Sequence, residues 1–384
     1  AITLDMEVSG QEVKSFSKPL DVRFTLNPNT INPETGENYA EPSVGANGFS
    51  GTSKDNAGAF ESTNWAAYID AEWDITDAWL LQLAFRHEDF KLFGETDNFK
   101  VATRYTVADF LTVRAAWSTG FRAPTPGQAN VVTITTSFDG VTGMQVQEGT
   151  IRPTDPIAQA LGGTALVPET SENLSVGIAS RINSNLSLTL DYYQVKVDDR
   201  IIKSRALPVV GNADFAEVAF YSNSLNTETS GLDAVLVWRN DKTNVSVAYN
   251  YNESEVISQR QVNGEDPVSE STIFNIQNNL PKHRASFAIN HDFGKLTAMV
   301  RANYYGSTVD ERGQREEVDP ATLIDLEFSY PMTDNLRFIL GSNNVLDKYP
   351  NMIETRVSQG MPFPRRTPIG YHGGMWYFKA IYKM

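Results

Sequence analysis

Cysteine is absent from this chain of 384 residues, so neither a disulfide framework nor a thiolate metal site can form. The chain also lacks any apolar run near the roughly 18 residues that a membrane-spanning helix needs. Its formal net charge of -15 argues against nucleic acid as a partner. No signal peptide is visible, and the first residues already have the pattern of a strand. We therefore expect a mature fragment rather than a full translation product.

Histidines are few, and they match no ligand spacing of a metal site. The four are His87, His283, His291 and His372. His283 and His291 fall at opposite ends of one expected strand, so they cannot share an ion. No serine lies in a nucleophile elbow, and Ser286 and His283 would point to opposite faces of their strand. We therefore expect no enzyme, no metal site and no cofactor.

The chain is rich in short segments in which apolar and polar residues alternate, which is the pattern of a two-faced β-strand. The clearest segments are residues 65–74, 80–88, 99–107, 111–118, 174–181, 186–197, 245–252, 285–290, 296–304, 323–330 and 336–344. Further strands are expected at residues 2–8, 22–26 and 372–384. Together these segments predict about fourteen or fifteen strands.

Alternation alone fits two architectures, because the apolar face can either meet lipid around a wet lumen or form the core of a soluble sandwich. Two features favour the membrane barrel. Aromatic residues gather near strand ends, as in the girdles of membrane barrels; they are Trp65, Trp73, Trp117, Tyr249, Tyr251, Tyr304, Tyr305 and Tyr330. Charged residues also occupy the polar faces in mid-strand, which suits a hydrated interior.

Short and long connections alternate along the chain. The expected short turns are residues 75–78, 108–109, 183–185, 240–243, 293–294 and 332–335. The expected long loops are residues 27–64, 122–169, 198–227, 252–282, 307–320 and 347–371. Bacterial barrels have short periplasmic turns and longer extracellular loops, so all the long loops should lie at one end. Residues 131–136, which are apolar, are expected to form a local hairpin or to cover the lumen.

The fold class is therefore all-β, a transmembrane antiparallel up-and-down β-barrel. We expect residues 1–384 to form one β-barrel domain. The residues expected to face lipid are Leu111, Val113, Trp117, Val245, Val247, Ile324, Leu326 and Phe328.

Three motifs resemble those of the TonB-dependent outer-membrane receptors. Residues 117–124 read WSTGFRAP, which is similar to the family's strand-ending S-x-G-F-R-A-P signature. Residues 168–173 read PETSEN and are followed by DYY at 191–193 and DDRI at 198–201, which resembles a strand pair of the family. Residues 343–349 read NNVLDKY, which is similar to the family's N-L-F-D-K-x-Y near the C-terminus. The three motifs occur in the family's order, and the resemblance covers roughly residues 64–384.

The resemblance implies a barrel of twenty-two strands with an N-terminal plug, and this chain departs from that pattern. It shows no plug domain, no energy-coupling box and fewer strands, so it resembles the C-terminal part of such a barrel. Family members usually end in Phe, whereas this chain ends in Met384. An open sheet would leave unpaired edges in lipid. We therefore expect the sheet not to close by itself and the missing parts to lie outside this chain.

Six residues are candidates for substrate contact: Arg114, Arg122, Arg301, Tyr305, Asp325 and Glu327. Arg122 ends a strand at the loop face, where it can touch substrate or tie the loop to the barrel rim. The charged residues of the polar face can contact substrate or hold a plug through ion pairs. Rings for stacking are offered by Phe138, Phe220, Tyr221 and Phe363.

One loop is acidic, with Asp310, Glu311, Glu316, Glu317 and Asp319. Calcium would suit such oxygen ligands, but the arginines between them favour a solvated loop.

The resemblance implies an outer-membrane receptor of a Gram-negative bacterium that takes up a scarce nutrient, such as an iron chelate, cobalamin or an oligosaccharide. Its implied partners are the lipid bilayer with lipopolysaccharide, the small-molecule nutrient, and the inner-membrane TonB energy-coupling complex, reached through the plug. A self-contained passive channel of about fourteen strands is the alternative.

Overall fold

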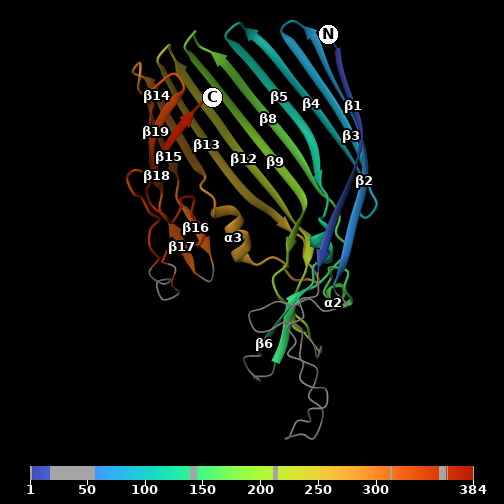
Figure 1. Cartoon of the computed structure of the whole chain (residues 1–384). Coiled ribbons are helices and arrows are strands. Elements are labelled where there is room, and N and C mark those ends of the chain that lie inside the picture. Colours follow the sequence, from blue (N-terminus) through green and yellow to red (C-terminus); the bar gives the residue numbers. More distant parts are fainter. Residues whose placement is uncertain are drawn as a thin grey trace.

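The computed structural model describes residues 2–17, 57–138, 145–210, 215–311, 314–353, 360 and 362–383. Within these residues one antiparallel sheet of fourteen strands dominates the molecule, and a four-stranded and a two-stranded sheet lie beside it (Figure 1). Its strands, in spatial order, are β1 (Ile2–Ser17), β2 (Gly58–Thr76), β3 (Trp79–Phe90), β4 (Gly94–Ala108), β5 (Leu111–Arg122), β8 (Glu169–Arg181), β9 (Leu186–Lys203), β12 (Tyr221–Arg239), β13 (Thr243–Gln259), β14 (His283–Asp292), β15 (Thr297–Tyr305), β18 (Ala321–Pro331), β19 (Leu336–Asn343) and β20 (Met375–Tyr382). Each pairs with the next in an up-and-down meander, so the all-β antiparallel prediction is confirmed.

The cross-strand register divides the sheet into one apolar and one polar face. Arg114 lies opposite Gly177, which lies opposite Asp191, which in turn lies opposite Asp233. Opposite residues share a face, so these positions define the polar face. The alternate positions carry large exposed apolar side chains on all these strands, including Ile69, Leu83, Val101, Trp117, Val176, Tyr192, Leu236, Val247, Phe287, Val300, Phe328, Leu340 and Phe378. The eight residues expected to face lipid all lie on this apolar face.

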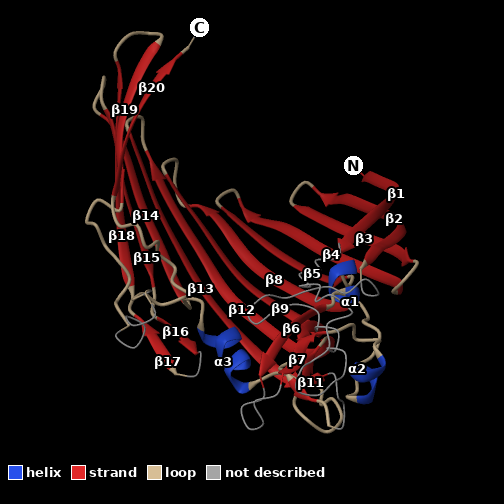
Figure 2. Ribbon diagram, turned by 60° about the horizontal axis from the view of Figure 1, so that its bottom comes forward, coloured by secondary structure: helices blue, strands red, loops and turns tan. Residues whose placement is uncertain are grey.

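The sheet is curved, and its edge strands β1 and β20 stand apart (Figure 2). In the described residues β1 pairs only with β2, and β20 only with β19. The polar face is crowded: a Cβ at Gly231 would collide with the Tyr193 ring, and one at Gly341 with the Tyr377 ring. Crowding of this kind is expected on the inner side of a bent wall, so we assign the polar face to the lumen.

The two ends of the sheet differ, as the sequence predicts. At one end, here called the turn end, the strands are joined by residues 77–78, 109–110, 182–185, 240–242, 293–296 and 332–335. At the other, the loop end, the connections are long, except for residues 91–93 between β3 and β4. That single short connection was not predicted.

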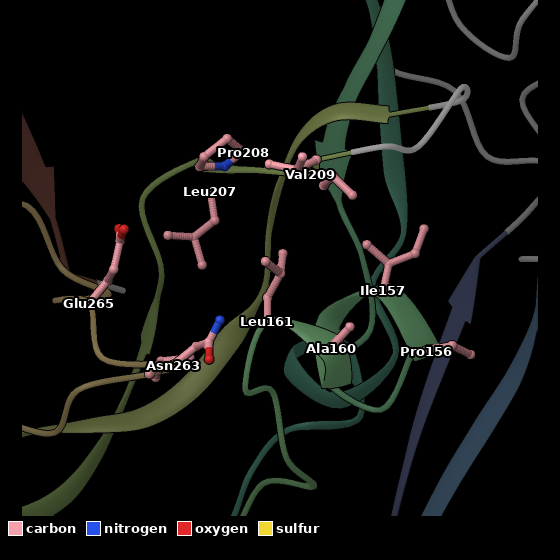
Figure 3. Close-up of a pocket in the computed structure, with 11 residues that line it drawn as sticks. Pro156, Ile157, Ala160, Leu161, Leu207, Pro208, Val209, Asn263 and Glu265 are labelled. Carbon is pink, nitrogen blue, oxygen red and sulfur yellow. The ribbon is translucent and has the colours of Figure 1, made fainter.

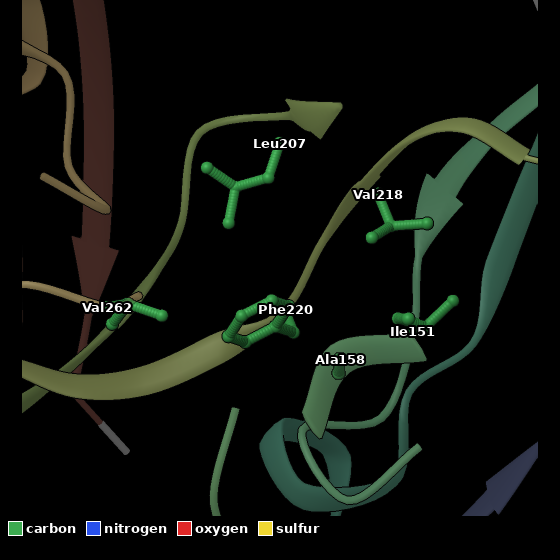
Figure 4. Packing of buried hydrophobic residues seen from close by; sticks show 6 residues of the cluster. All are labelled: Ile151, Ala158, Leu207, Val218, Phe220 and Val262. Carbon is green, nitrogen blue, oxygen red and sulfur yellow. The ribbon is translucent and has the colours of Figure 1, made fainter. Parts of the chain in front are cut away.

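The loop end carries a small folded layer of its own. It consists of β6 (Thr133–Phe138), β7 (Gln145–Thr150), β10 (Leu207–Pro208) and β11 (Phe215–Ala219), with α1 (Pro126–Asn130) and α2 (Pro156–Ala160). Phe220, Val218 and Ala158 are completely buried and pack with Ile151, Leu207 and Val262 in a compact core (Figure 4). Of the stretch 131–136, for which a local hairpin was one expectation, residues 133–136 form part of the single strand β6, which pairs antiparallel with β7 further along the chain. Phe220, expected to offer its ring for stacking, is instead part of this core.

Further toward the C-terminus, α3 (Glu270–Asn278) and the hairpin β16 (Thr308–Glu311) and β17 (Arg315–Val318) complete the loop end. Asn275 of α3 binds the backbone N–H and C=O of Glu311 through its side-chain amide, at 2.7 and 2.6 Å. In the described part of the chain, no helix is long and apolar enough to cross a membrane.

Several predicted boundaries are wrong at the loop end. β9 continues to Lys203 and β12 already begins at Tyr221, inside the predicted loop 198–227. β13 continues to Gln259, β2 begins at Gly58, and loop 307–320 contains a hairpin. The reason is visible in β12, where the consecutive residues 222–225 are all buried, so both faces are covered and the alternation disappears. The expected strand at residues 22–26 lies outside the described residues, while the one at residues 2–8 extends to Ser17.

Candidate functional site

Arg114 and Asp191 form a bidentate ion pair on the polar face. The Arg114 Nε and Nη2 donate to the two carboxylate oxygens of Asp191 at 2.8 and 2.6 Å. Gly177 lies between them in the register and leaves room for the pair, because a Cβ there would collide with the Asp191 carboxylate. The side chain of Arg114, a predicted site residue, is therefore fixed against the sheet by this ion pair.

Arg301, Asp325 and Glu327 form a second polar group, in the middle of β15 and β18. Arg301 Nε donates to Asp325 at 3.1 Å, and the backbone N–H of Asn344 donates to the other Asp325 oxygen at 2.9 Å. Glu327 accepts a hydrogen bond of 2.6 Å from the hydroxyl of Tyr377 on β20. These contacts join β15, β18 and β20, and the residue that follows β19, across the lumen face.

Arg122 is bound at the rim of the loop end. Its Nε and Nη2 donate to the two carboxylate oxygens of Glu169, which begins the neighbouring strand β8. Glu169 is only 6% exposed and also accepts the backbone N–H of Ile201 at 2.6 Å. Arg122 and Glu169 thus join β5, β8 and β9 where the chain leaves the sheet for its longest described connection.

Tyr305, another predicted site residue, lies beside an open groove. It lies on the polar face opposite Arg284, which lies opposite Asn250. All three line a groove of about 440 Å³ along β12 to β15.

Arg284 also lines a second cavity, of about 560 Å³, which the sequence did not predict. The other lining residues come from the segment after α3, residues 279–281, and from residues 365–368 of the last long connection. Two further arginines, Arg365 and Arg366, stand in this wall. Both approach one oxygen of Asp310, at 3.6 and 3.2 Å.

The acidic loop is solvated only in part: Glu317 and Asp319 are exposed as predicted, whereas two other carboxylates are buried. Asp310 is 1% exposed and Glu316, directly opposite it in the β16–β17 hairpin, is 9% exposed. Arg366, which helps to neutralise Asp310, lies 56 residues further along the chain. The residues near Asp310 in the sequence do not reveal this partner, so the sequence alone predicted only exposure to solvent or binding of calcium. Among the described residues no group of three or more acidic, histidine or cysteine side chains is arranged to hold a metal ion.

A third cavity, of about 620 Å³, is lined mainly by apolar side chains and lies in the loop layer (Figure 3). Leu161 and Ile157 of the α2 region face Leu207 across it, with Asn263 and Glu265 at one side. It adjoins the buried core of that layer.

Three aromatic rings stack in the last long connection. Tyr349 and Phe363 are parallel within 13° at 6.2 Å, and Phe363 and Tyr371 within 19° at 5.7 Å. The negative charge of Asp347, with burial and a hydrogen bond to the same carboxylate, raises the pKa of the Tyr349 hydroxyl. Phe363, one of the rings predicted to be available at the loop end, is therefore stacked with other loop residues.

Comparison with known proteins agrees with this geometry. The family described as TonB dependent receptor-like, beta-barrel, matches residues 5–345. An iron-regulated outer membrane virulence protein of Vibrio cholerae is 24% identical over 303 residues, which cover 76% of this chain and 42% of that protein. The vitamin B12 transporter BtuB of Photobacterium profundum is 22% identical over 288 residues, covering 75% and 40%.

Solved structures show the same fold. The siderophore receptor PirA of Acinetobacter baumannii superposes with a TM-score of 0.66 at 14% identity, over 99% of this chain and 52% of that one. A single-site mutant of the ferric enterobactin receptor PfeA of Pseudomonas aeruginosa gives the same TM-score and identity, over 99% and 50%.

The fold and the match over residues 5–345 define an outer-membrane receptor barrel, and the chain belongs to the TonB-dependent receptor family. This is a family of outer-membrane proteins of Gram-negative bacteria that serve nutrient uptake. The chain spans about two fifths of the length of the curated relatives that it matches.

Proposed function

We propose that this chain is the C-terminal part of a barrel that takes up a scarce nutrient by TonB-coupled transport. The observation that carries the proposal is the family match over residues 5–345, combined with a sheet whose two edges do not meet in the described residues. Edges in lipid must be paired. Further strands, together with a plug domain, would therefore come from outside this chain.

The substrate class that we propose is a small nutrient such as an iron chelate, cobalamin or an oligosaccharide. The relatives include proteins described as a vitamin B12 transporter and as siderophore receptors, which supports this range. Binding would take place at the loop end, since only the connections there are long enough to reach across a wide lumen.

The ion pairs of the lumen face suggest how a plug would be held. Arg114 and Arg301 each bind a carboxylate of the same sheet, and Glu327 accepts a hydrogen bond from a tyrosine hydroxyl. We propose that they present a fixed polar surface to the plug rather than leave their places for substrate. Tyr305, which lines an open groove, is retained as a substrate contact.

Uptake in whole cells tests the proposal. Cells that carry the complete gene should accumulate a radiolabelled iron chelate or cobalamin, and accumulation should stop when the inner-membrane energy-coupling complex is deleted. A passive channel would instead equilibrate small solutes regardless of that complex and would show no saturation. Uptake that persists without energy coupling would overturn the proposal and favour the channel.

A further inference from the structure

Three guanidinium groups gather at one cavity of the loop end although the chain as a whole is strongly acidic. Arg284, Arg365 and Arg366 line the space of about 560 Å³ between the end of α3 and residues 365–368. The formal net charge of the chain is -15. A positive cluster in such a chain is not explained by its composition.

The cluster is only partly neutralised. Arg365 and Arg366 share a single carboxylate, that of Asp310, and both approach the same oxygen of it. In the part of the chain that the structure describes, Arg284 makes no ion pair. The neighbouring cation Lys282 is already bound to Glu253. Asp310 is thus shared by two arginines, with the buried Glu316 opposite it in the hairpin, while Arg284 has no carboxylate partner among the described residues.

The arginines also have donors to spare. A guanidinium has five N–H donors, and its fork matches carboxylates and similar oxyanions. The side chains of Arg365 and Arg366 are 36% and 44% exposed, so each is partly open to solvent. Asp310 is 1% exposed and cannot follow a ligand, which makes it a fixed anchor that aims the two arginines.

The position of Arg284 decides which kind of anion can reach the cavity. Its register partners are Asn250 and Tyr305, so it lies on the polar face of the sheet. Phosphate groups of the surrounding lipid lie around the opposite, apolar face. Arg284 therefore faces away from the lipid, which favours a soluble anion entering from the loop end as the ligand.

We propose that this cavity binds a small soluble polyanion, such as a chelate that carries several carboxylate or comparable oxyanion groups. The inference rests on the proposed uptake function and narrows its substrate class to negatively charged nutrients. The cavity volume falls in the usual range of ligand pockets, roughly 300–1,000 Å³. Arg284 contacts the ligand directly, and Asp310 positions Arg365 and Arg366.

Direct binding to the purified intact protein in detergent tests the assignment, with citrate as the polyanionic probe and inorganic phosphate as a smaller one. Arg284→Gln should weaken citrate binding about tenfold to a hundredfold, the loss expected for one charge-assisted contact. Arg260→Gln is the matched control: it removes the same charge from the loop end, outside the cavity lining, and should leave binding unchanged. Binding should also fall as salt is raised.

A second variant separates binding from loop packing. Removing Arg365 and Arg366 alone would leave a buried carboxylate without a counter-charge, so the double change to Gln is combined with Asp310→Asn. This triple variant should fold and should bind citrate more weakly than the wild-type protein.

Three results would overturn the assignment: no binding of either probe at millimolar concentration, equal binding by Arg284→Gln and wild type, or unchanged binding in the triple variant. The uptake experiment fails independently of these. Energy-independent uptake with intact citrate binding would sink the coupling proposal and leave the anion site standing.

Discussion

Leu326 offers a sharp test of which face of the sheet meets lipid. It is the central residue of β18, between Val300 on β15 and Ser342 on β19, and it lies on the apolar face. A membrane strand crosses the hydrocarbon in about 9–11 residues. The middle of this eleven-residue strand should therefore lie near the midplane of the bilayer.

Leu326→Arg would place a guanidinium in hydrocarbon. The expected loss is roughly 2–4 kcal/mol, the range for arginine at the midplane on the lipid face of a barrel. At about 1.4 kcal/mol for each factor of ten, the folding equilibrium constant falls roughly 30-fold to 700-fold.

The matched control is Leu323→Arg. Leu323 is on the same strand but on the polar face, opposite Asn303, and Asp325 lies two residues further on the same face. The identical change should cost about 1 kcal/mol or less there, because the guanidinium meets water and a carboxylate. Glu327→Gln, which keeps an acceptor for Tyr377, should also cost about 0.5–1.5 kcal/mol.

The assay is urea-titrated, reversible folding of the intact protein into lipid vesicles, with the free energy of unfolding compared among the three variants. Equal losses for Leu326→Arg and Leu323→Arg would refute the face assignment, and a larger loss for Leu323→Arg would reverse it.

Four further predictions follow from individual contacts. A double-mutant cycle on Arg114→Gln and Asp191→Asn should give a coupling of about 1 kcal/mol, because Arg114 is half exposed and water screens the pair; zero coupling in the folding assay would contradict a fixed pair. Gly341→Ala should cost about 1–3 kcal/mol by displacing the Tyr377 ring, and Tyr377→Ala in the same protein should remove most of that cost; an undiminished loss would mean that the clash is elsewhere. Glu169→Ala should leave the Ile201 N–H and Arg122 without their acceptor and speed proteolysis within residues 123–168, whereas Glu169→Gln should do so less; equal cleavage rates in all three proteins would refute the rim contact. Tyr349 should titrate at higher pH than free tyrosine, since Asp347 disfavours the phenolate, and Asp347→Asn should lower the midpoint seen by ultraviolet absorbance; an unchanged midpoint would exclude that cause.

The strands, and the face on which each of their residues lies, could be predicted from the sequence. The reason is that lipid requires apolar side chains and the lumen polar ones, at alternate residues. Leu111, Val113 and Trp117 could be placed on the apolar face, and Arg114 on the other, from their spacing alone. Beyond the apolar band the two faces experience similar surroundings. The alternation then fades, and the sequence predicts loops where the outer parts of β9, β12 and β13 are strands.

The candidate site was predictable in part. Arg114, Arg122 and Arg301 were found because each is a charge in or at the end of an otherwise regular strand. The arginines of the loop-end cavity were not found, since nothing near Arg365 in the sequence points to Asp310 or Arg284.

The sequence alone therefore determined the class of architecture, the meander of strands, the turn and loop ends, and the family resemblance, because these depend on periodicity and local motifs. Only the tertiary structure decided which charges are partnered. Asp310 became a buried anchor, Glu169 a rim contact and Phe220 a core residue through segments far apart in the chain. Such contacts depend on the cross-strand register and on how the long connections fold over the sheet, and neither leaves a periodic signal in the sequence.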